Sequence, residues 1–203
     1  EVGAKVILTD KLVREQQNNV MTMIGKQLGD AMARKKDTDV HSLYSALNGG
    51  VTLGGSAAMS LANVAGAIAY AKANKFGSQV YILQHPNAVF DIANSAITAS
   101  QYAIPKGWSE DLLGNFWSGI RPLNGVPIFE DGNLAVTSND AVGVIAAKDA
   151  LAVLKSVDTR TEKQRDASMR ATEVIITSDY GVFELDDSKG APLTFDAAAP
   201  ATS

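Results

Sequence analysis

The residues that could support chemistry are few, and the glycine-rich stretch 49–56 comes first among them. Its glycines occupy the first and sixth positions of a phosphate-binding loop, Gly49 and Gly54, and Ser56 occupies the eighth. Gly55 stands where such a loop carries the lysine that reaches the phosphates, so the charge that binding requires is missing. We therefore interpret the stretch as a flexible crossing followed by a serine-capped helix, and keep nucleotide binding as the less favoured alternative.

The other candidate groups lack the partners that catalysis or metal binding needs. The two histidines, His41 and His85, are too few for a histidine metal site unless carboxylates complete it, and we expect both to be structural. The acidic pairs Glu130-Asp131 and Asp186-Asp187 lie in predicted turns, where water solvates both carboxylates. No serine lies in a Gly-x-Ser-x-Gly elbow, and the chain has no cysteine. The sequence thus predicts no catalytic residue, no cofactor and no metal, and the chain is not expected to be an enzyme.

Composition sets the class of protein. The chain has 203 residues, of which 46% are hydrophobic, as in an ordered globular protein. No apolar run is long enough to span a bilayer, so no membrane association is expected. The formal net charge of −4 disfavours a general affinity for nucleic acid. Because Glu1 opens directly onto an apolar strand, we expect further sequence upstream of it.

The first part of the chain predicts a strand and an amphipathic helix. Residues 2–8 read as an apolar strand, and Thr9-Asp10 can cap the helix. Its apolar positions recur at helical spacing, at Val13, Val20, Ile24, Leu28, Ala31 and Met32. Residues 40–47 continue this stripe or form a second helix. The basic run 34–36 is typical of a solvated helix end, with nucleic-acid contact as the less favoured alternative.

From about residue 50 the composition becomes alanine-rich and apolar, which predicts a separate compact lobe. A helix that starts at residues 54–56 should bury Leu61, Val64, Ala65, Ile68 and Ala69. Residues 80–83 predict a buried strand, and Pro86 starts the next helix. The long segment 95–118 holds both tryptophans, Trp108 and Trp117, which either contact a partner subunit or simply pack against the lobe.

The last part of the chain is predicted to be rich in strands. Residues 126–129 and 134–137 flank Glu130-Asp131-Gly132-Asn133, which is typical of a hairpin turn. A buried strand at 142–147 precedes a short helical pattern at 148–155 and a charged turn at 158–166. Two further strands are predicted, at 169–178 and 180–186, followed by another strand at 191–195 and a flexible tail at 197–203.

The order of these elements resembles the major capsid protein of tailed double-stranded-DNA bacteriophages, which has the Hong Kong 97-type fold. In that family the last strand of an extended loop feeds a long spine helix, as residues 6–47 do here. An axial strand ends in a proline-led helix, like Leu83-Gln84-His85-Pro86, and a later strand reads Gly-hydrophobic-Pro-hydrophobic, like Gly125-Val126-Pro127-Ile128. Residues 165–183 resemble the peripheral strand pair that ends in Tyr180-Gly181. The resemblance covers nearly the whole chain.

The resemblance implies an α+β fold with a long spine helix, a peripheral β-sheet domain and an axial α/β domain. It divides the chain into residues 1–49, the end of the extended loop and the spine helix; 50–155, the axial domain; 156–196, the returning peripheral strands; and 197–203, the tail. Residues 95–118 would then hold the loop that approaches the rotation axes, with Ile104 and Trp108 as subunit contacts. No asparagine lies within 166–172, so lysine–asparagine cross-linking of the kind known in some relatives is not expected.

The implied function is structural. Copies of the chain would form pentamers and hexamers and close an icosahedral shell around the double-stranded DNA genome, which the subunits do not bind sequence-specifically. Scaffolding, portal and decoration proteins are the further partners, and the mature location is the virion after assembly in the host cytoplasm. The alternatives are an encapsulin-type nanocompartment shell and, more distantly, a nucleotide-binding α/β enzyme.

Overall fold

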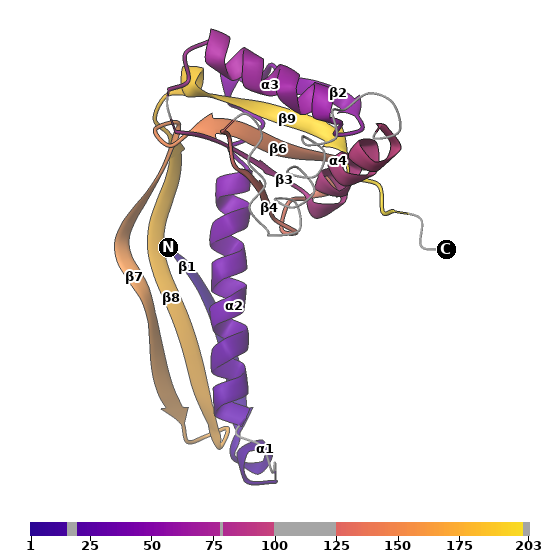
Figure 1. Cartoon of the computed structure of the whole chain (residues 1–203). Coiled ribbons are helices and arrows are strands. Elements are labelled where there is room, and N and C mark those ends of the chain that lie inside the picture. Colours follow the sequence, from indigo (N-terminus) through magenta and orange to yellow (C-terminus); the bar gives the residue numbers. More distant parts are fainter. Residues whose placement is uncertain (16–19, 78, 100–124, 201–203) are drawn as a thin grey trace. The chain divides into compact units, whose positions relative to one another are not determined.

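The chain folds into two compact units, each built from segments that are far apart in the sequence. A computed structural model describes residues 1–15, 20–77, 79–99 and 125–200. Unit 1 comprises Glu1–Val40 and Val153–Phe183, and unit 2 comprises His41–Ala152 and Glu184–Ser203. Both units combine helices with β-sheet, which confirms the predicted α+β class (Figure 1).

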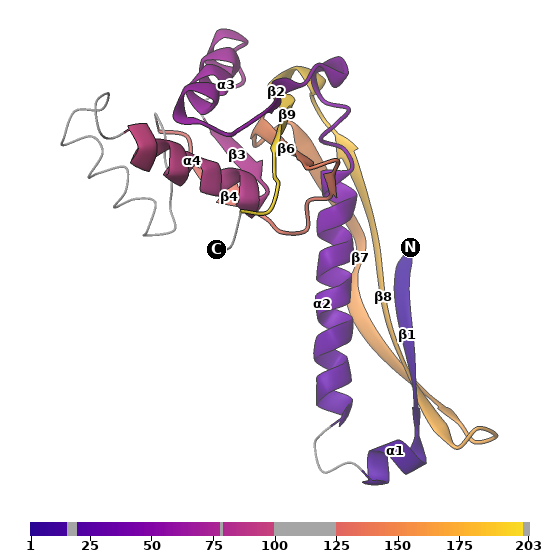
Figure 2. The ribbon, with the colours of Figure 1, turned by 90° about the vertical axis from the view of Figure 1, so that its right-hand side faces the viewer.

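Unit 1 packs one long helix along one face of a three-stranded sheet. The strand order is β1 (Val2–Thr9), β8 (Ala171–Glu184) and β7 (Leu151–Asp166), and β1 runs antiparallel to β8 with Val6 opposite Val174. The helix is α2 (Val20–His41), which lies alongside these strands in Figures 1 and 2. Every second side chain of β1 faces the helix, so the two elements share a core formed by Leu8, Leu28, Met32, Val174 and Ile176.

The predicted helical stripe is correct in the middle of α2 and wrong at two positions. Leu28 and Met32 are buried, and Val20 and Ile24 pack against the same core. Val13 instead belongs to a separate short helix, α1 (Asp10–Glu15), and its side chain is 46% exposed. Ala31 lies on the exposed side of α2, because one residue along a helix turns the side chain by about 100° from its neighbour.

Strands β7 and β8 replace four shorter elements predicted from the sequence. Residues 151–155 are strand rather than helix, and 158–166 continue that strand rather than forming a turn. No turn interrupts β8, which runs through Tyr180 and Gly181. The charged residues of β7 have a low strand propensity, but hydrogen bonding to β8 stabilises the strand. Nearly the whole length of β7 is exposed, so its charges stay in water.

Unit 2 is built on a mixed sheet with two helices against its buried side. The strand order is β2 (Leu53–Ala57), β9 (Gly190–Asp196), β6 (Asp140–Ala147), β3 (Val80–Gln84) and β4 (Ile128–Glu130), and β5 (Val136–Thr137) pairs with β6. Helices α3 (Leu61–Ala73) and α4 (Pro86–Ala99) share a core with the sheet, which includes Val64, Ile68, Val89, Ile92, Ile82, Ile145 and Phe195. Short 3-10 helices form at Asn48–Gly50 and Asp187–Lys189.

Two predicted elements of unit 2 are wrong, and Ala69, predicted to be buried, lies on the exposed side of α3. The strands on either side of residues 130–133 do not pair with each other, because β4 pairs in parallel with β3 and β5 pairs with β6. Pairing β4 with β3 places Ile128 opposite Ile82, so that both side chains are buried. Helix α3 is capped by Ser60 rather than by Ser56, since Ser60 accepts a hydrogen bond from the Asn63 amide. Residues 53–57, where this helix was predicted to start, instead form β2.

A buried glutamine joins the central strands of unit 2. The Gln84 side chain is fully buried, and its Nε2 donates to the carbonyl oxygens of Ala141 and Leu193 at 3.4 and 3.2 Å. Its Oε1 accepts from the His85 amide at 2.9 Å. Gly143 makes room for this side chain, because a Cβ at that position would lie 2.6 Å from Oε1. Gln84 thus bonds to both β6 and β9 from β3.

Candidate functional site

The glycine-rich stretch 49–56 has no phosphate-binding geometry. Its second half is strand β2. Gly54 is needed there because its φ is +96° and a Cβ would lie 2.5 Å from the Thr194 carbonyl oxygen. The Gly49 amide donates to the Asp187 carboxylate at 3.1 Å. A carboxylate therefore already occupies the donor that a phosphate would need, and its charge would repel an anion.

His41 is enclosed rather than catalytic. Its Nε2 lies 3.3 Å from Asp131 Oδ2, and its ring contacts that of Tyr44 with the centroids 5.2 Å apart. Its Nδ1 is buried and has no hydrogen-bond partner among the residues that the structure describes. A general base must reach its substrate with one nitrogen, but Nε2 faces the Asp131 carboxylate and Nδ1 is buried. Within unit 2, His41 instead contacts the turn after β4 through Asp131.

The remaining candidate groups have local structural roles. His85 Nδ1 accepts from the Asn87 amide at 3.2 Å, at the start of α4. Asp131 Oδ1 accepts from the Asn133 amide at 2.8 Å and shapes the turn. Asp186 accepts from the amide and the hydroxyl of Ser188, which caps the second 3-10 helix and holds the pKa of that carboxyl below its usual range. The hydrogen bonds of these groups serve to fix turns and helix starts.

The basic run at the end of α2 takes part in a polar cluster within unit 1. Tyr180 donates its hydroxyl to Asp39 at 2.6 Å, and Lys35 bonds the other oxygen of Asp39 at 2.6 Å. Lys36 bonds Thr159 at 2.6 Å and lies 5.5 Å from the centre of the Tyr180 ring. Burial and the Asp39 carboxylate raise the pKa of Tyr180 to about 12, while Lys35 and Tyr180 lower the pKa of Asp39. Of the three cations, Lys36 thus joins α2 to β7 directly, and Lys35 holds the Asp39 carboxylate that accepts the bond from Tyr180 on β8.

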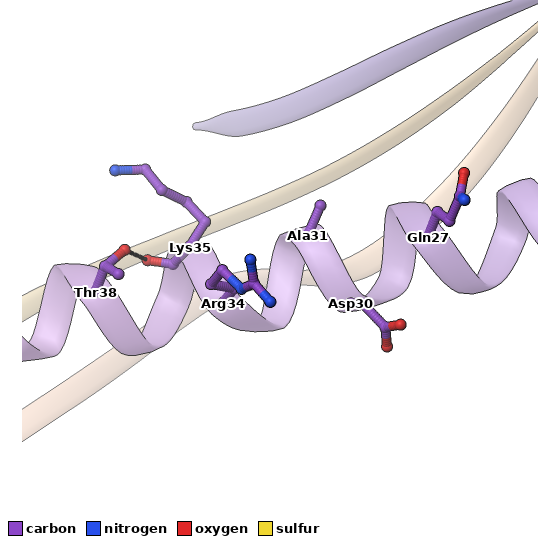
Figure 3. Close-up of a pocket in the computed structure, with 6 residues that line it drawn as sticks. All are labelled: Gln27, Asp30, Ala31, Arg34, Lys35 and Thr38. Atoms are coloured by element: carbon purple, nitrogen blue, oxygen red, sulfur yellow. Dashed lines mark hydrogen bonds between the residues drawn. The ribbon is translucent and has the colours of Figure 1, made fainter. Parts of the chain in front are cut away.

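Arg34 lies instead in a shallow groove of about 500 Å³ along the exposed side of α2, drawn in Figure 3. The groove is lined by Gln27, Asp30, Ala31, Arg34, Lys35 and Thr38, all from this helix. Its one hydrogen bond drawn in Figure 3 runs from the Thr38 hydroxyl to the Lys35 carbonyl oxygen at 2.9 Å. With charges of both signs and no enclosing second wall, it is a solvated helix face, as the sequence suggested, rather than a ligand site.

Two features are absent from the described part of the chain. No three His, Cys, Asp or Glu side chains gather there closely enough to hold a metal ion. None of the helices described is both long and apolar enough to cross a membrane. The predicted subunit contacts Ile104 and Trp108 lie outside the described residues.

The sequence did not indicate the ion pair between Asp10 and Arg165, nor the bond between Tyr180 and Asp39. In both pairs the partners lie more than a hundred residues apart, so no local spacing connects them. The only available signal was the i,i+4 spacing of Lys35 and Asp39 on α2.

The chain matches a protein-family model. The model described as "Phage capsid protein" matches residues 1–191. No curated protein sequence matches the chain.

Solved structures of shell proteins share the fold. The capsid of Ralstonia phage GP4 superposes with a TM-score of 0.74 at 10% identity, over 100% of this chain and 74% of the phage chain. A chain of Mycobacterium phage Che8 superposes with a TM-score of 0.72 at 15% identity, over 98% of this chain and 71% of the phage chain. The SrpI encapsulin of Synechococcus elongatus superposes with a TM-score of 0.71 at 11% identity, over 100% of this chain and 76% of the encapsulin chain. The fold is therefore the Hong Kong 97-type fold, and at these identities the likeness does not separate phage capsids from encapsulins.

Proposed function

Since this chain belongs to the phage capsid protein family and is a major capsid shell protein, we propose that its copies associate as pentamers and hexamers into an icosahedral shell around the double-stranded DNA genome of a phage. The observation that carries this proposal is the family match, which extends over residues 1–191. A closed shell needs one subunit that presents different surfaces to its neighbours around several rotation axes, so that many modest contacts add up.

The two units fit the two parts that such a subunit needs. We assign unit 1, with α2 and the long strands, to the peripheral domain, and unit 2 to the axial domain. The segment 95–118, with Ile104 and Trp108, then approaches the five-fold and six-fold axes. No group found in the described residues calls for a substrate, so we propose no catalytic activity.

The charge of the chain fits enclosure of DNA without tight binding. The formal net charge is −4, and two of the three cations at the end of α2 are engaged within unit 1. Packaged DNA would therefore be confined by the shell rather than held by its subunits. Scaffolding, portal and decoration proteins are the further partners we propose, with assembly in the host cytoplasm.

An encapsulin-type compartment is the second candidate, because the SrpI encapsulin has the same fold at a TM-score of 0.71. In that case the shell would enclose a protein cargo instead of a genome. The same subunit contacts would serve either content, so only the content separates the two functions.

Negative-stain electron microscopy of the purified full chain, taken as its largest species by size exclusion, tests the proposal. Uniform polyhedral particles are expected. Particles from infected or expressing cells that contain nuclease-protected DNA would support the phage capsid, and a single co-purifying protein would support the encapsulin. A monomer or dimer under all assembly conditions would contradict both.

A further inference from the structure

Unit 2 contains an asparagine–glycine pair, Asn48-Gly49, in its first 3-10 helix. This dipeptide is the one most prone to deamidation, because glycine leaves its own backbone nitrogen open to the side chain before it. In that reaction the Gly49 nitrogen bonds to Asn48 Cγ, the Cγ–Nδ2 bond breaks, and ammonia leaves with the amide proton. Water then opens the resulting succinimide to aspartate or isoaspartate. The contacts of the pair therefore decide whether the chain is altered with time.

The Asn48 side chain is bonded to two other groups of unit 2. Its Nδ2 donates to the Val51 carbonyl oxygen at 3.0 Å and to the Tyr70 hydroxyl oxygen at 3.1 Å. The Tyr70 ring packs edge-on against Phe76, with the ring centroids 6.2 Å apart, which holds the hydroxyl in place. Ring closure expels Nδ2, so both bonds of this nitrogen must be given up before the succinimide can form.

The attacking nitrogen is held by a carboxylate. The Gly49 amide donates to Asp187 Oδ2 at 3.1 Å and lies 3.3 Å from Oδ1. A backbone nitrogen attacks a carbonyl carbon only after it has lost its proton, and the anion that forms would face the negative charge of Asp187. The bond to a charged acceptor also stabilises the amide in its protonated form. Asp187 therefore disfavours ring closure at Asn48.

Asp187 reaches Gly49 from a distant part of the chain. It begins the second 3-10 helix, Asp187–Lys189, which lies between β8 and β9. Asp186 caps that helix by accepting from the Ser188 amide at 3.1 Å. Gly49 is exposed, so separation of the two 3-10 helices leaves its amide free in water. The protection of the pair thus depends on a contact that local opening can remove.

We propose that Asn48 is a latent deamidation site, silent while Asp187 and Tyr70 hold the pair and reactive when the second 3-10 helix separates from the first. The product has a new carboxylate at position 48 and no longer has the Nδ2 bond to Val51. Its charge repels that of Asp187, so the two 3-10 helices are hindered from closing again. A prolonged opening is thereby converted into a permanent change. This inference concerns the single subunit and does not rest on the proposed shell function.

Peptide mass spectrometry of the unmodified full chain tests the protection directly. Folded subunits and guanidinium-denatured chain are incubated side by side at the same mildly alkaline pH and temperature, and the fraction of Asn48 converted to aspartate or isoaspartate is followed with time. The folded chain should react roughly a hundredfold more slowly, because two hydrogen bonds worth about a factor of ten each must be given up. Equal rates in the two samples would overturn the proposal.

Variants of the holding groups provide the second measurement, made below the melting temperature of each variant so that global unfolding does not contribute. Asp187→Ala should raise the rate at Asn48 in the folded chain by roughly tenfold, as expected for the loss of one bond to a charged group. Tyr70→Phe, which removes only the hydroxyl, should raise it by a smaller factor. Asp149→Ala is the matched control, because it removes an exposed acid from another turn of unit 2, and it should leave the rate unchanged.

Hydrogen exchange of the Gly49 amide shows whether opening is the cause. Asp187→Ala should speed this exchange by about the same factor as it speeds deamidation, since both reactions need the amide to be released. Faster deamidation without faster exchange would overturn the proposal, as would equal rates in Asp187→Ala and Asp149→Ala. A reaction that is faster in the folded than in the denatured chain would show that Asp187 takes up the amide proton and promotes ring closure, and would likewise overturn its protective role.

Discussion

Tyr180 on β8 donates its hydroxyl to Asp39 near the end of α2, and the two oxygens lie 2.6 Å apart. The same carboxylate accepts a bond from Lys35, also at 2.6 Å. This short chain of bonds connects the helix of unit 1 to the middle strand of its sheet, where the apolar core of Leu28 and Met32 has already ended.

Replacing Tyr180 with Phe removes this bond without changing the ring. We expect the free energy of unfolding to fall by about 1–2 kcal/mol at neutral pH, as for other hydrogen bonds to a charged group. Urea unfolding of the free subunit measures it. Tyr81→Phe is the control, because the Tyr81 hydroxyl makes no hydrogen bond to the residues that the structure describes and its loss should change stability little. Equal effects from the two variants would contradict the structural role of the pair.

The same pair predicts a loss of stability in strong alkali. The pKa of Tyr180 is raised from 10.0 to about 12, by burial first and by Asp39 second. A raised pKa means that the stabilisation is complete below pH 10.0 and is lost as the pH rises toward 12. Wild-type subunits should therefore lose stability more steeply over this range than Tyr180→Phe subunits. Parallel curves would show that folding does not raise the pKa of this hydroxyl.

Gln84→Leu should be among the most damaging single changes to unit 2. It leaves the carbonyl oxygens of Ala141 and Leu193 and the His85 amide without their partner inside the sheet. We expect a loss of about 2–3 kcal/mol in unfolding free energy, measured by urea titration. Gln164→Leu, on the exposed strand β7, is the matched control and should change stability by less than about 0.5 kcal/mol.

Gly54→Ala separates the structural role of the glycine-rich stretch from nucleotide binding. The new Cβ would lie 2.5 Å from the Thr194 carbonyl oxygen at a φ of +96°, so the midpoint of thermal unfolding should fall by several degrees. Isothermal titration of the unmodified chain with ATP and magnesium should show no binding. Saturable binding that Gly54→Ala abolishes would instead favour the nucleotide-binding enzyme.

Asp91→Asn should stabilise the free subunit at neutral pH. Burial first, and the nearby Asp196 second, raise the pKa of Asp91 above its usual value of 3.8. The ionised form is thus disfavoured in the folded state, so this group favours folding most below pH 3.8 and opposes it once the pH exceeds the raised pKa. The gain should be about 0.5 kcal/mol at pH 7, and it should vanish near pH 3. A gain that persists in acid would indicate a cause other than charge.

Trp108→Ala tests the predicted axial contact, which rests on the family resemblance alone. The subunit should keep its circular dichroism and its melting temperature, while rings and complete particles fall sharply in electron micrographs. Ile104→Ala should act in the same direction with a smaller effect. Normal particles from Trp108→Ala would remove this residue from the assembly contacts.

Elements with a clear local period were predictable from the sequence. The stripe through Leu28 and Met32 predicted α2, the apolar run before Pro86 predicted β3 and the start of α4, and residues 142–147 predicted β6. In each case the burial that stabilises the element is visible in its own residues. The order of these elements, rather than any one of them, carried the resemblance to capsid proteins.

Elements stabilised by distant partners were not predictable. Residues 158–166 have the composition of a turn, and only pairing with β8 makes them strand. The turn at Asp131 suggested a hairpin, but β4 pairs with β3, some forty residues earlier, because Ile128 can then be buried against Ile82. The contacts of Asp187 with the Gly49 amide and of His41 with Asp131 likewise could not be predicted, because their partners are distant in the sequence.

Strand β7 has a consequence for subunits that have not yet assembled. It is an edge of its sheet, and its side chains are charged at Lys155, Asp158, Arg160, Glu162, Lys163, Arg165 and Asp166. Two copies that tried to pair along this edge would have to desolvate these charges, so open-ended sheet growth is disfavoured. A shell protein has to accumulate before it can close a shell. The charged edge allows a concentrated pool of subunits to remain free of aggregates until the specific contacts form.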